Sequence, residues 1–253
     1  MIYRKRPEEI DLMRQAGRIV AETLVLCRDS VKAGMTTAEL DQIAEDHIRS
    51  RGAAPSFKGY RGFTGTLCTS LNGEIVHGIP DEKVTILEGD VLKIDCGAIV
   101  EGFHGDSAMT VFIGEPSEQA RRLSEVTRAS LEAGIEQARI GNRVGDIGEA
   151  VQSIVEAAGF SVVREYVGHG IGRSLHEDPP IPNHGRSGKG IPLKEGMVIA
   201  IEPMVNIGSA ETRLLEDGWT VVTADGSLSS HWEHTIAILP EGPEVLTRRP
   251  DEG

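Results

Sequence analysis

Two nine-residue segments decide the fold that this sequence predicts: LEGDVLKID at residues 87–95 and KEGMVIAIE at residues 194–202. They lie 107 residues apart, and four of their nine positions are identical. Asp95 at the end of the first segment falls on another carboxylate, Glu202, at the end of the second. Self-similarity at a fixed offset is the signature of an internal duplication. We therefore expect a fold of two related halves.

The same offset relates two predicted helices. Thr36 and Glu39 have the spacing of a capping box at the start of one helix, which ends at Gly52. A corresponding helix runs from about Val144 to Gly159, and the offset places Gly159 on Gly52. Two separate matches in one register favour a duplication over chance.

Each predicted half consists of two helices followed by strands. Ahead of the helices just described, further helices begin at Pro7 and at Ser117. Short apolar or β-branched runs bounded by Gly, Pro, Asp or Ser predict strands at Val91–Asp95, Ala108–Ile113, Val198–Glu202, Thr220–Thr223 and Glu233–Leu239. This order indicates an α+β fold, with helices on one face of a largely antiparallel sheet. We expect a single domain over residues 1–253, with halves at roughly 7–113 and 117–240.

Composition and charge exclude several classes of protein. Lys and Arg total 26 and Asp and Glu total 39, which gives a formal net charge of −13. A negative field repels phosphate backbones and anionic lipid, so we expect neither a specific nucleic acid nor a membrane as partner. Cys27, Cys68 and Cys96 form no CxxC pair and favour a reducing compartment. The charged first residues do not form a signal peptide, and no apolar run is long enough to span a bilayer. We expect a cytoplasmic protein.

Isolated acids and a histidine carry the candidate chemistry. Asp95, Glu202 and Glu233 each interrupt or end a predicted apolar strand, where a lone ionised carboxylate is costly to bury. A divalent metal ion would offset that cost. Asp106 and His169 stand in glycine-rich segments and complete the candidate set. From these residues alone, a metal centre and a set of ordinary salt-bridged acids are equally good interpretations.

Several short blocks together resemble type I methionine aminopeptidases, in their short bacterial form, over essentially the whole chain. The blocks are NGEIVHGIP at 72–80, Asp95, GFHGD at 102–106, GHGIGR at 168–173, HEDP at 176–179, PN at 182–183, EPM at 202–204 and EHT at 233–235. The resemblance implies the pita-bread (creatinase/aminopeptidase) fold, in which helices of two pseudo-symmetric halves back a curved antiparallel sheet. That fold agrees with the internal repeat.

The resemblance also implies a centre of two divalent metal ions. Asp106 and Glu233 would bridge both ions, Asp95 would bind one, and His169 with Glu202 the other. Four carboxylates and one imidazole suit Co²⁺, Mn²⁺ or Fe²⁺ and do not exclude Zn²⁺. Together these ions would activate a water for attack on the first peptide carbonyl and bind the substrate amine.

Roles for other side chains follow from the same resemblance. Glu202 would carry a proton from the water to the leaving amine, His176 would stabilise the oxyanion, and His77 would hydrogen-bond near the scissile nitrogen or the tetrahedral intermediate. The residues implied in substrate binding are His77, His176, Phe57, Tyr60, Phe63, Cys68, Leu175 and Trp219. The apolar members of this set would receive the methionine side chain.

The implied reaction is removal of the N-terminal methionine from nascent proteins and peptides with a small second residue. The implied enzyme is a monomer that works near the ribosomal exit tunnel. An Xaa-Pro aminopeptidase or prolidase is the alternative, since it shares fold and ligands; such proteins usually carry a further N-terminal domain, for which the helix at Pro7 leaves no room. A non-catalytic peptide-binding protein on this fold is a weaker alternative, because such relatives lose metal ligands and this sequence has all five.

The sequence departs from the family pattern beside the expected pocket. Leu175 stands where family members usually carry Phe, and Thr64–Thr66 replaces a more usual Pro-containing stretch. We expect both departures near the pocket, where they leave the breadth of accepted substrates open.

Overall fold

The computed structural model describes residues 2–252, in which pairs of helices precede sets of strands. The first part contains α1 (Pro7–Ser30), α2 (Thr37–Ser50), β1 (Ala54–Pro55), the short 3₁₀ helix η1 (Tyr60–Gly62), β2 (Leu67–Leu71), β3 (Glu74–Val76), β4 (Val91–Val100) and β5 (Phe103–Phe112). The second contains α3 (Glu118–Gln137), α4 (Val144–Ala157), β6 (Ser161–Val162), β7 (Gly168–Gly170), β8 (Glu177–Ile181), β9 (Val198–Ile201), β10 (Met204–Asn206), β11 (Thr212–Leu214), β12 (Val221–Thr223), β13 (Ser229–His231), β14 (His234–Leu239) and β15 (Gly242–Val245).

The predicted helices are all present, and local capping explains where they start. Thr36 Oγ1 accepts from the Glu39 amide at 3.2 Å, and the Glu39 carboxylate accepts from the Thr36 amide at 2.8 Å, so the predicted capping box forms. Ser117 caps α3 by accepting from the Ala120 amide at 3.1 Å. Pro7 occupies the first turn of α1, where no intrahelical amide bond is lost.

The strands of the described residues form four antiparallel sheets rather than one continuous sheet. One sheet has the order β1-β4-β2 with β5 paired to β4, and another has the order β15-β14-β9-β7-β8. Two three-stranded sheets, β13-β10-β6 and β11-β12-β3, complete the described topology. The five predicted strands correspond to β4, β5, β9, β12 and β14 with shifted ends: Glu233, for example, lies just ahead of β14.

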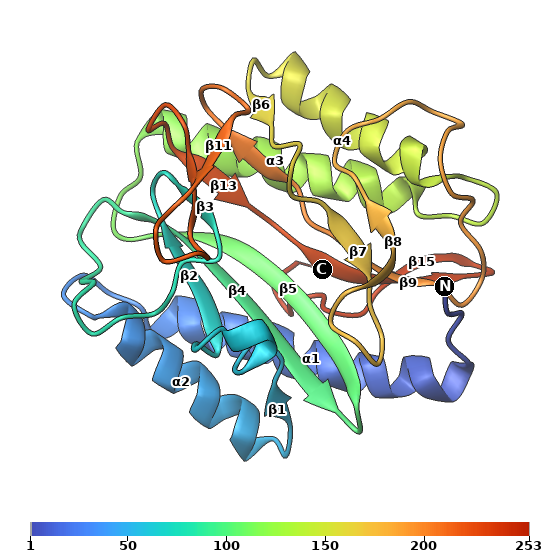
Figure 1. Ribbon diagram of the computed structural model, residues 1–253, viewed down its shortest axis with the longest axis horizontal. Coiled ribbons are helices and arrows are strands. Elements are labelled where there is room, and N and C mark those ends of the chain that lie inside the picture. Colours follow the sequence, from blue (N-terminus) through green and yellow to red (C-terminus); the bar gives the residue numbers. More distant parts are fainter. Residues whose placement is uncertain (1, 253) are drawn as a thin grey trace.

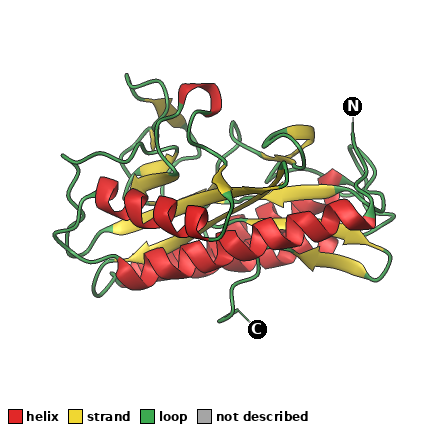
Figure 2. Ribbon diagram, turned by 90° about the horizontal axis from the view of Figure 1, so that it is seen from below, coloured by secondary structure: helices red, strands yellow, loops and turns green. Residues whose placement is uncertain are grey.

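Helices and strands form layers. Figure 2 shows the long helices gathered toward one side of the molecule and the loops and short strands toward the other. In Figure 1, α1 and α2 lie side by side against β4 and β2, and α3 and α4 form a second pair. The largest apolar cluster takes residues from both parts of the chain, among them Leu24, Ile94, Ile147, Ile199 and Ile236. Helices of both parts therefore share one core, and the duplication into halves 7–113 and 117–240 remains a prediction.

Helix α1 lies very close to the back of β5. A Cβ on Gly105 would meet the backbone nitrogen of Gly17 at 2.8 Å, and a Cβ on Gly17 would meet the Leu246 carbonyl oxygen at 2.3 Å. Only glycine allows backbones to approach this closely. The contact fixes β5, which carries Asp106, against the helical layer. Within residues 2–252, no helix is long and apolar enough to cross a membrane.

Candidate metal centre

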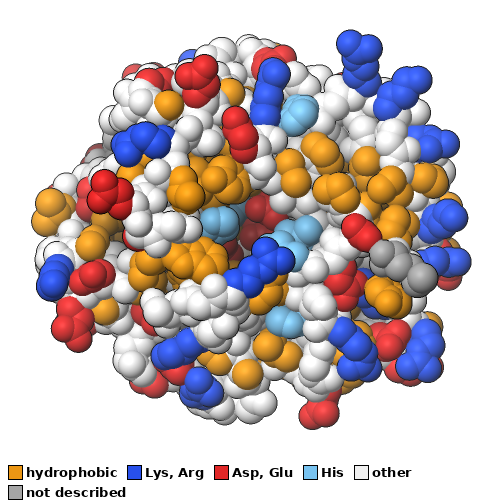
Figure 3. Space-filling model, in the orientation of Figure 1, with side chains coloured by type: hydrophobic (Ala, Val, Ile, Leu, Met, Phe, Trp, Pro, Cys, Tyr) orange, Lys and Arg blue, Asp and Glu red, His pale blue; other side chains and the backbone are white. Residues whose placement is uncertain are grey.

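One cavity of about 330 Å³ brings the predicted site residues together. Figure 3 shows a hollow near the middle of one face, with acidic side chains at its bottom and histidine and hydrophobic side chains around it. The lining residues are Phe57, Tyr60, Arg61, Phe63, Cys68, His77, Asp95, Asp106, His169, Leu175, His176, Glu202, Trp219 and Glu233. Every residue predicted as a metal ligand, catalytic group or substrate contact is among them.

Paired strands bring the acidic residues to the cavity. Asp95 lies within β4 and Asp106 within β5, and these two strands pair along their whole length. The two carboxyl groups are within hydrogen-bonding reach of each other. Glu202 directly follows β9 and Glu233 directly precedes β14, which pair with Ile201 opposite His234. The β4–β5 pair therefore runs past the cavity, and the β9–β14 pair ends at it.

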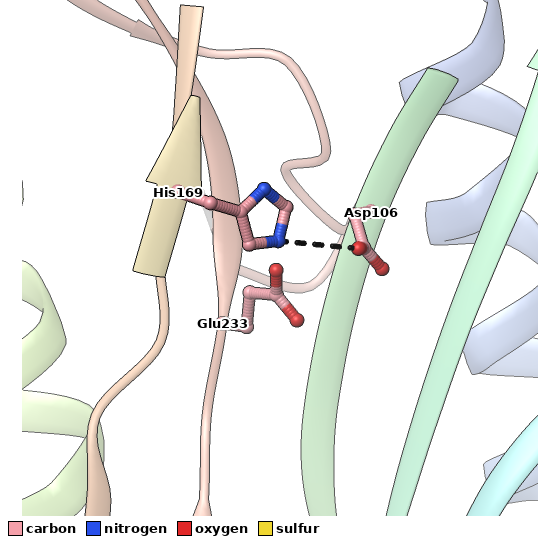
Figure 4. A group of neighbouring side chains, drawn as sticks. All are labelled: Asp106, His169 and Glu233. Carbon is pink, nitrogen blue, oxygen red and sulfur yellow. Dashed lines mark ion pairs between the residues drawn. The ribbon is translucent and has the colours of Figure 1, made fainter. Parts of the chain in front are cut away.

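Asp106, His169 and Glu233 form a compact buried group (Figure 4). One potential ligand atom from each residue lies within 4.8 Å of the others. His169 Nε2 is 3.9 Å from Asp106 Oδ2 and 3.5 Å from Glu202 Oε1. His169 Nδ1 lies 2.9 Å from the Gly170 carbonyl oxygen, to which it can donate. That bond leaves the lone pair of Nε2 facing the acids, as metal-binding histidines require.

Burial perturbs every titratable group of this set. It raises the pKa of Asp95 to about 7. Burial, reinforced by the neighbouring carboxylates, also holds the pKa values of Asp106, Glu202 and Glu233 well above their usual range. The pKa of His169 falls to about 3, chiefly through burial. The imidazole is therefore neutral, and the acids need a cation to ionise together.

The donor set fits divalent metal ions. Asp95 Oδ1, Asp106 Oδ1 and Glu233 Oε1 are buried and have no hydrogen-bond partner among residues 2–252. Leaving such oxygens unpaired is costly, and coordination of a cation would satisfy them. Carboxylate oxygens with one imidazole nitrogen are donors that Mn²⁺, Fe²⁺, Co²⁺ and Zn²⁺ accept.

Two further histidines stand at the cavity. His176 Nδ1 lies 2.9 Å from the Tyr60 hydroxyl, and its ring centroid is 4.2 Å from that of His169. Its pKa is lowered by burial and, secondarily, by the charge of Arg61. His77 follows β3, and burial lowers its pKa to about 4. Both imidazoles are neutral near pH 7, so each offers one N–H donor.

An apolar wall completes the cavity. Its residues belong to one cluster: Phe57, Phe63, Cys68 and Leu175 are buried, and Tyr60 and Trp219 pack against them. Phe63 and Trp219 meet edge to face with centroids 5.1 Å apart. Of the two departures from the family pattern, only Leu175 lines the cavity. Residues 64–66 are not among the lining residues, and the Thr66 amide is bonded to Asp41 of α2 at 2.8 Å.

Some neighbours of the site carried no clear signal in the sequence. Arg61 lines the cavity mouth from η1 with a φ of 48°, and its guanidinium lies 5.3 Å from the Tyr60 ring centroid. His231 is buried with Nε2 4.0 Å from Glu202 Oε2. The side chain of Asn183 donates to the Glu202 carbonyl at 3.0 Å.

Comparisons with known proteins agree with this geometry. The family model "Metallopeptidase family M24" matches residues 11–240. Methionine aminopeptidase of Clostridium perfringens is 55% identical over 247 residues, which cover 98% of this chain and 99% of the relative. The crystal structure of methionine aminopeptidase from Thermotoga maritima matches with a TM-score of 0.96 at 44% identity, covering 98% of this chain and 100% of that one. Prolidase from Pyrococcus furiosus matches with a TM-score of 0.79 at 23% identity, covering 97% of this chain and 65% of that one, a likeness of fold alone.

Proposed function

The chain belongs to metallopeptidase family M24 and has its pita-bread α+β fold, and we propose that it removes the N-terminal methionine of proteins and peptides. It is similar over almost its whole length to bacterial proteins named methionine aminopeptidase. The observation that carries the proposal is the buried Asp106, His169 and Glu233 group at the end of a cavity with an apolar wall. It combines metal-binding chemistry with a pocket for an apolar side chain.

Two divalent metal ions are proposed for the centre, as Co²⁺, Mn²⁺ or Fe²⁺, with Zn²⁺ also compatible. Asp106 and Glu233 would contact both ions, Asp95 one, and His169 and Glu202 the other. The unpaired buried oxygens of Asp95, Asp106 and Glu233 support this assignment. When bound, such ions lower the pKa of a water and polarise a peptide carbonyl, which is the chemistry that hydrolysis needs.

The chain's own groups would move the protons and hold the developing charge. Glu202, ionised in the metal-loaded centre, would take a proton from the water and pass it to the leaving amine. When the Tyr60 hydroxyl donates to His176 Nδ1, the Nε2–H of His176 is free to stabilise the oxyanion. The neutral His77 would donate near the scissile nitrogen or the tetrahedral intermediate.

Specificity would come from the two ends of the cavity. The wall of Phe57, Tyr60, Phe63, Cys68, Leu175 and Trp219 suits the thioether of methionine, which packs well on aromatic faces. The acidic end would hold the free amine, so that only a terminal residue fits. We expect a small second residue to be preferred.

Nascent polypeptide N-termini are the proposed partners, met in the cytoplasm near the ribosomal exit tunnel by a monomeric enzyme. The net charge of −13 and the three free, buried cysteines are compatible with that setting. Co-sedimentation with ribosomes and analytical ultracentrifugation test these two points separately.

A peptide panel tests the reaction. We expect the metal-loaded protein to release Met from Met-Ala-Ser and to spare Leu-Ala-Ser. We expect it to show no preference for the bond before proline in Met-Pro and Ala-Pro peptides. Cleavage confined to bonds before proline would instead indicate the Xaa-Pro enzymes that share the fold. Binding of Met-Ala-Ser without turnover, with any of the four metals, would favour a non-catalytic peptide-binding protein.

A further inference from the structure

We propose that residues 246–252 form a clamp that holds Asp106 and Glu233 at the spacing the metal ions require, with Thr247 and Arg249 as its positioning residues. This inference rests on the metal centre proposed above. It concerns the side of the ligand-bearing strands that faces away from the cavity.

The spacing between Asp106 and Glu233 is not fixed by a β ladder. Asp106 lies in β5 and Glu233 just before β14, and these strands belong to different sheets. In residues 2–252, no ladder pairs β5 with β14. One backbone hydrogen bond, from the Glu233 amide to the carbonyl of Ala108 in β5 at 3.0 Å, joins the two ligand-bearing segments directly. Side chains must therefore contribute to holding the two acids together.

The residues that directly follow Asp106 and Glu233 point away from the metal site. Asp106 and Glu233 line the cavity, whereas their successors Ser107 and His234 do not and are almost completely buried. Successive residues of an extended chain point to opposite sides, which explains this arrangement. Ser107 and His234 therefore offer polar groups on the back of the two ligand-bearing segments.

Thr247 binds the β14 side of this arrangement. Its Oγ1 accepts from the Thr235 amide at 3.0 Å and lies 2.9 Å from His234 Nδ1. The Leu246 amide donates to the Thr235 carbonyl at 2.9 Å. Thr235 Oγ1 in turn accepts from the Asp106 amide at 3.0 Å and donates to the Asp106 carbonyl at 2.7 Å. Residues 246 and 247 thus fix Thr235, which in turn bonds both the amide and the carbonyl of Asp106.

Arg249 joins the two sides with one guanidinium group. Nη1 donates to Ser107 Oγ at 3.1 Å, and the Ser107 hydroxyl donates to the Glu233 carbonyl at 2.5 Å. Nη2 lies 3.4 Å from His234 Nε2 and 2.8 Å from Glu252 Oε1, which supplies the opposite charge. The side chain is 2% exposed and stacks 5.3 Å from the Trp232 ring centroid.

A planar fork of this kind holds two partners at a set separation, which an ammonium group does not. Arg249 contacts the residue after each of the two acids, so its loss should loosen their mutual position. Groups that orient metal ligands from behind typically change metal affinity by about 10- to 100-fold when they are removed.

The test measures metal affinity directly. Arg249→Met, Arg249→Lys and Thr247→Val are stripped of metal, shown to be folded by thermal melting, and titrated with Mn²⁺ by calorimetry. We expect Arg249→Met and Thr247→Val to raise the Kd for Mn²⁺ by about 10- to 100-fold. The Kd of Arg249→Lys should lie between their values and that of the wild type. The visible spectrum of the Co²⁺-loaded variants should shift, because the ligand geometry changes.

Two matched controls separate positioning from general stability. Arg248→Met removes the exposed neighbour, whose guanidinium, among the residues that the structure describes, bonds the Glu252 carbonyl at 3.1 Å and neither of the ligand-bearing strands. Thr127→Val removes a buried hydroxyl that bonds the Leu123 carbonyl at 2.8 Å within α3. Both should keep the wild-type Kd and Co²⁺ spectrum.

Two results would overturn the proposal, and they differ in what else they overturn. In the first result, Thr247→Val and Arg249→Lys melt at a lower temperature, as Thr127→Val does, yet keep the wild-type Kd and Co²⁺ spectrum. Residues 246–252 would then stabilise the fold without positioning the metal ligands. A wild-type protein that binds no divalent metal would overturn the proposed function together with the clamp.

Discussion

At the scale of single residues, burial governs the chemistry of the site. Four carboxyl groups share one cavity with a neutral imidazole, and burial is the largest cause of each pKa shift. Such a cluster is unfavourable by itself, because neighbouring like charges in a largely buried site cannot all ionise. Metal ions turn this unfavourable cluster into a binding site.

His176 is expected to act on the substrate without binding metal. Its Nδ1 is engaged with Tyr60, and it lies beside the buried ligand group. His176→Ala should lower kcat by about 10²- to 10³-fold, the usual cost of losing one oxyanion donor. The metal content, measured by mass spectrometry of the purified variant, should not change.

His184→Ala is the matched control, because His184 is not among the cavity-lining residues. It should leave kcat and metal content unaltered. Metal lost from His176→Ala would make that histidine a ligand, and an unaltered kcat would remove it from the mechanism.

Leu175 is expected to set how large a first residue the cavity accepts. It is buried in the apolar wall, at the position where the family resemblance led us to expect Phe. Leu175→Phe should fill space, and kcat/KM for peptides with a first residue larger than Met should fall roughly 10-fold relative to Met-Ala-Ser. Leu214→Phe, at an exposed position on β11, serves as control. Unchanged selectivity in Leu175→Phe would show that this position does not limit substrate size.

At the scale of elements, paired strands and strand ends position the acidic ligands. Asp95 and Asp106 lie within adjacent strands, and Glu202 and Glu233 stand at the ends of another pair. Close backbone approach holds this arrangement against α1: a Cβ on Gly105 of β5 would meet the Gly17 nitrogen at 2.8 Å, and a Cβ on Gly17 would meet the Leu246 carbonyl oxygen. The helical layer and the ligand strands are thus in direct backbone contact.

Gly17→Ala tests that contact. A new Cβ would lie 2.3 Å from the Leu246 oxygen, so the backbones must move apart. Helix propensity alone would stabilise the variant by up to about 1 kcal/mol, but overpacking costs about 1–3 kcal/mol. Urea unfolding should therefore show a net destabilisation. The exposed Gln15→Ala on the same helix should be almost neutral, and a Gly17→Ala protein more stable than wild type would contradict the close approach.

How far the sequence predicts these elements depends on where the information lies. The starts of α2 and α3 are encoded locally by Thr36, Glu39 and Ser117, so they were predictable. Strand ends depend on partners far away in the chain: β4 and β5 each run to ten residues because they pair with one another. The division into four sheets is a tertiary property for the same reason.

The site shows the same contrast. The candidate ligands could be named from motif blocks and the apolar pocket residues from the family resemblance, and all of them line one cavity. Arg61 could not be found, because its position depends on a left-handed turn in η1. The contact of Arg249 with Ser107, 142 residues away along the chain, has no local signal at all. The contacts of Thr247 with Thr235 and His234, 12 and 13 residues away, also depend on how the chain folds back.

At the scale of the whole molecule, metal binding should couple to stability and pH. The folded pKa of Asp95 is raised to about 7, and those of the other three carboxyls are raised as well. Groups with a raised folded pKa stabilise the fold at low pH, and this contribution is lost as pH rises through the folded pKa. Metal-free protein should therefore lose the contribution of Asp95 between about pH 4 and 7, and those of the other three carboxyls as pH rises through their own raised pKa values.

Metal ions reverse that trend, because they bind the ionised carboxylates. The rise in Tm caused by Mn²⁺ should increase from pH 5 to pH 8, and calorimetry in two buffers should record proton release on binding. The difference between loaded and metal-free protein removes the effect of groups elsewhere. A metal-induced rise in Tm that stays constant or shrinks with pH would contradict the buried-carboxylate account.

The central claim is that a metal centre in this cavity removes N-terminal methionine. The most direct measurement titrates chelator-stripped protein with Mn²⁺ and follows bound metal and Met release from Met-Ala-Ser in the same sample. We predict no release without metal, release that rises with occupancy, and no release from Leu-Ala-Ser at any occupancy. Full activity in the stripped protein, or none at full occupancy with Mn²⁺, Fe²⁺, Co²⁺ or Zn²⁺, would contradict the account.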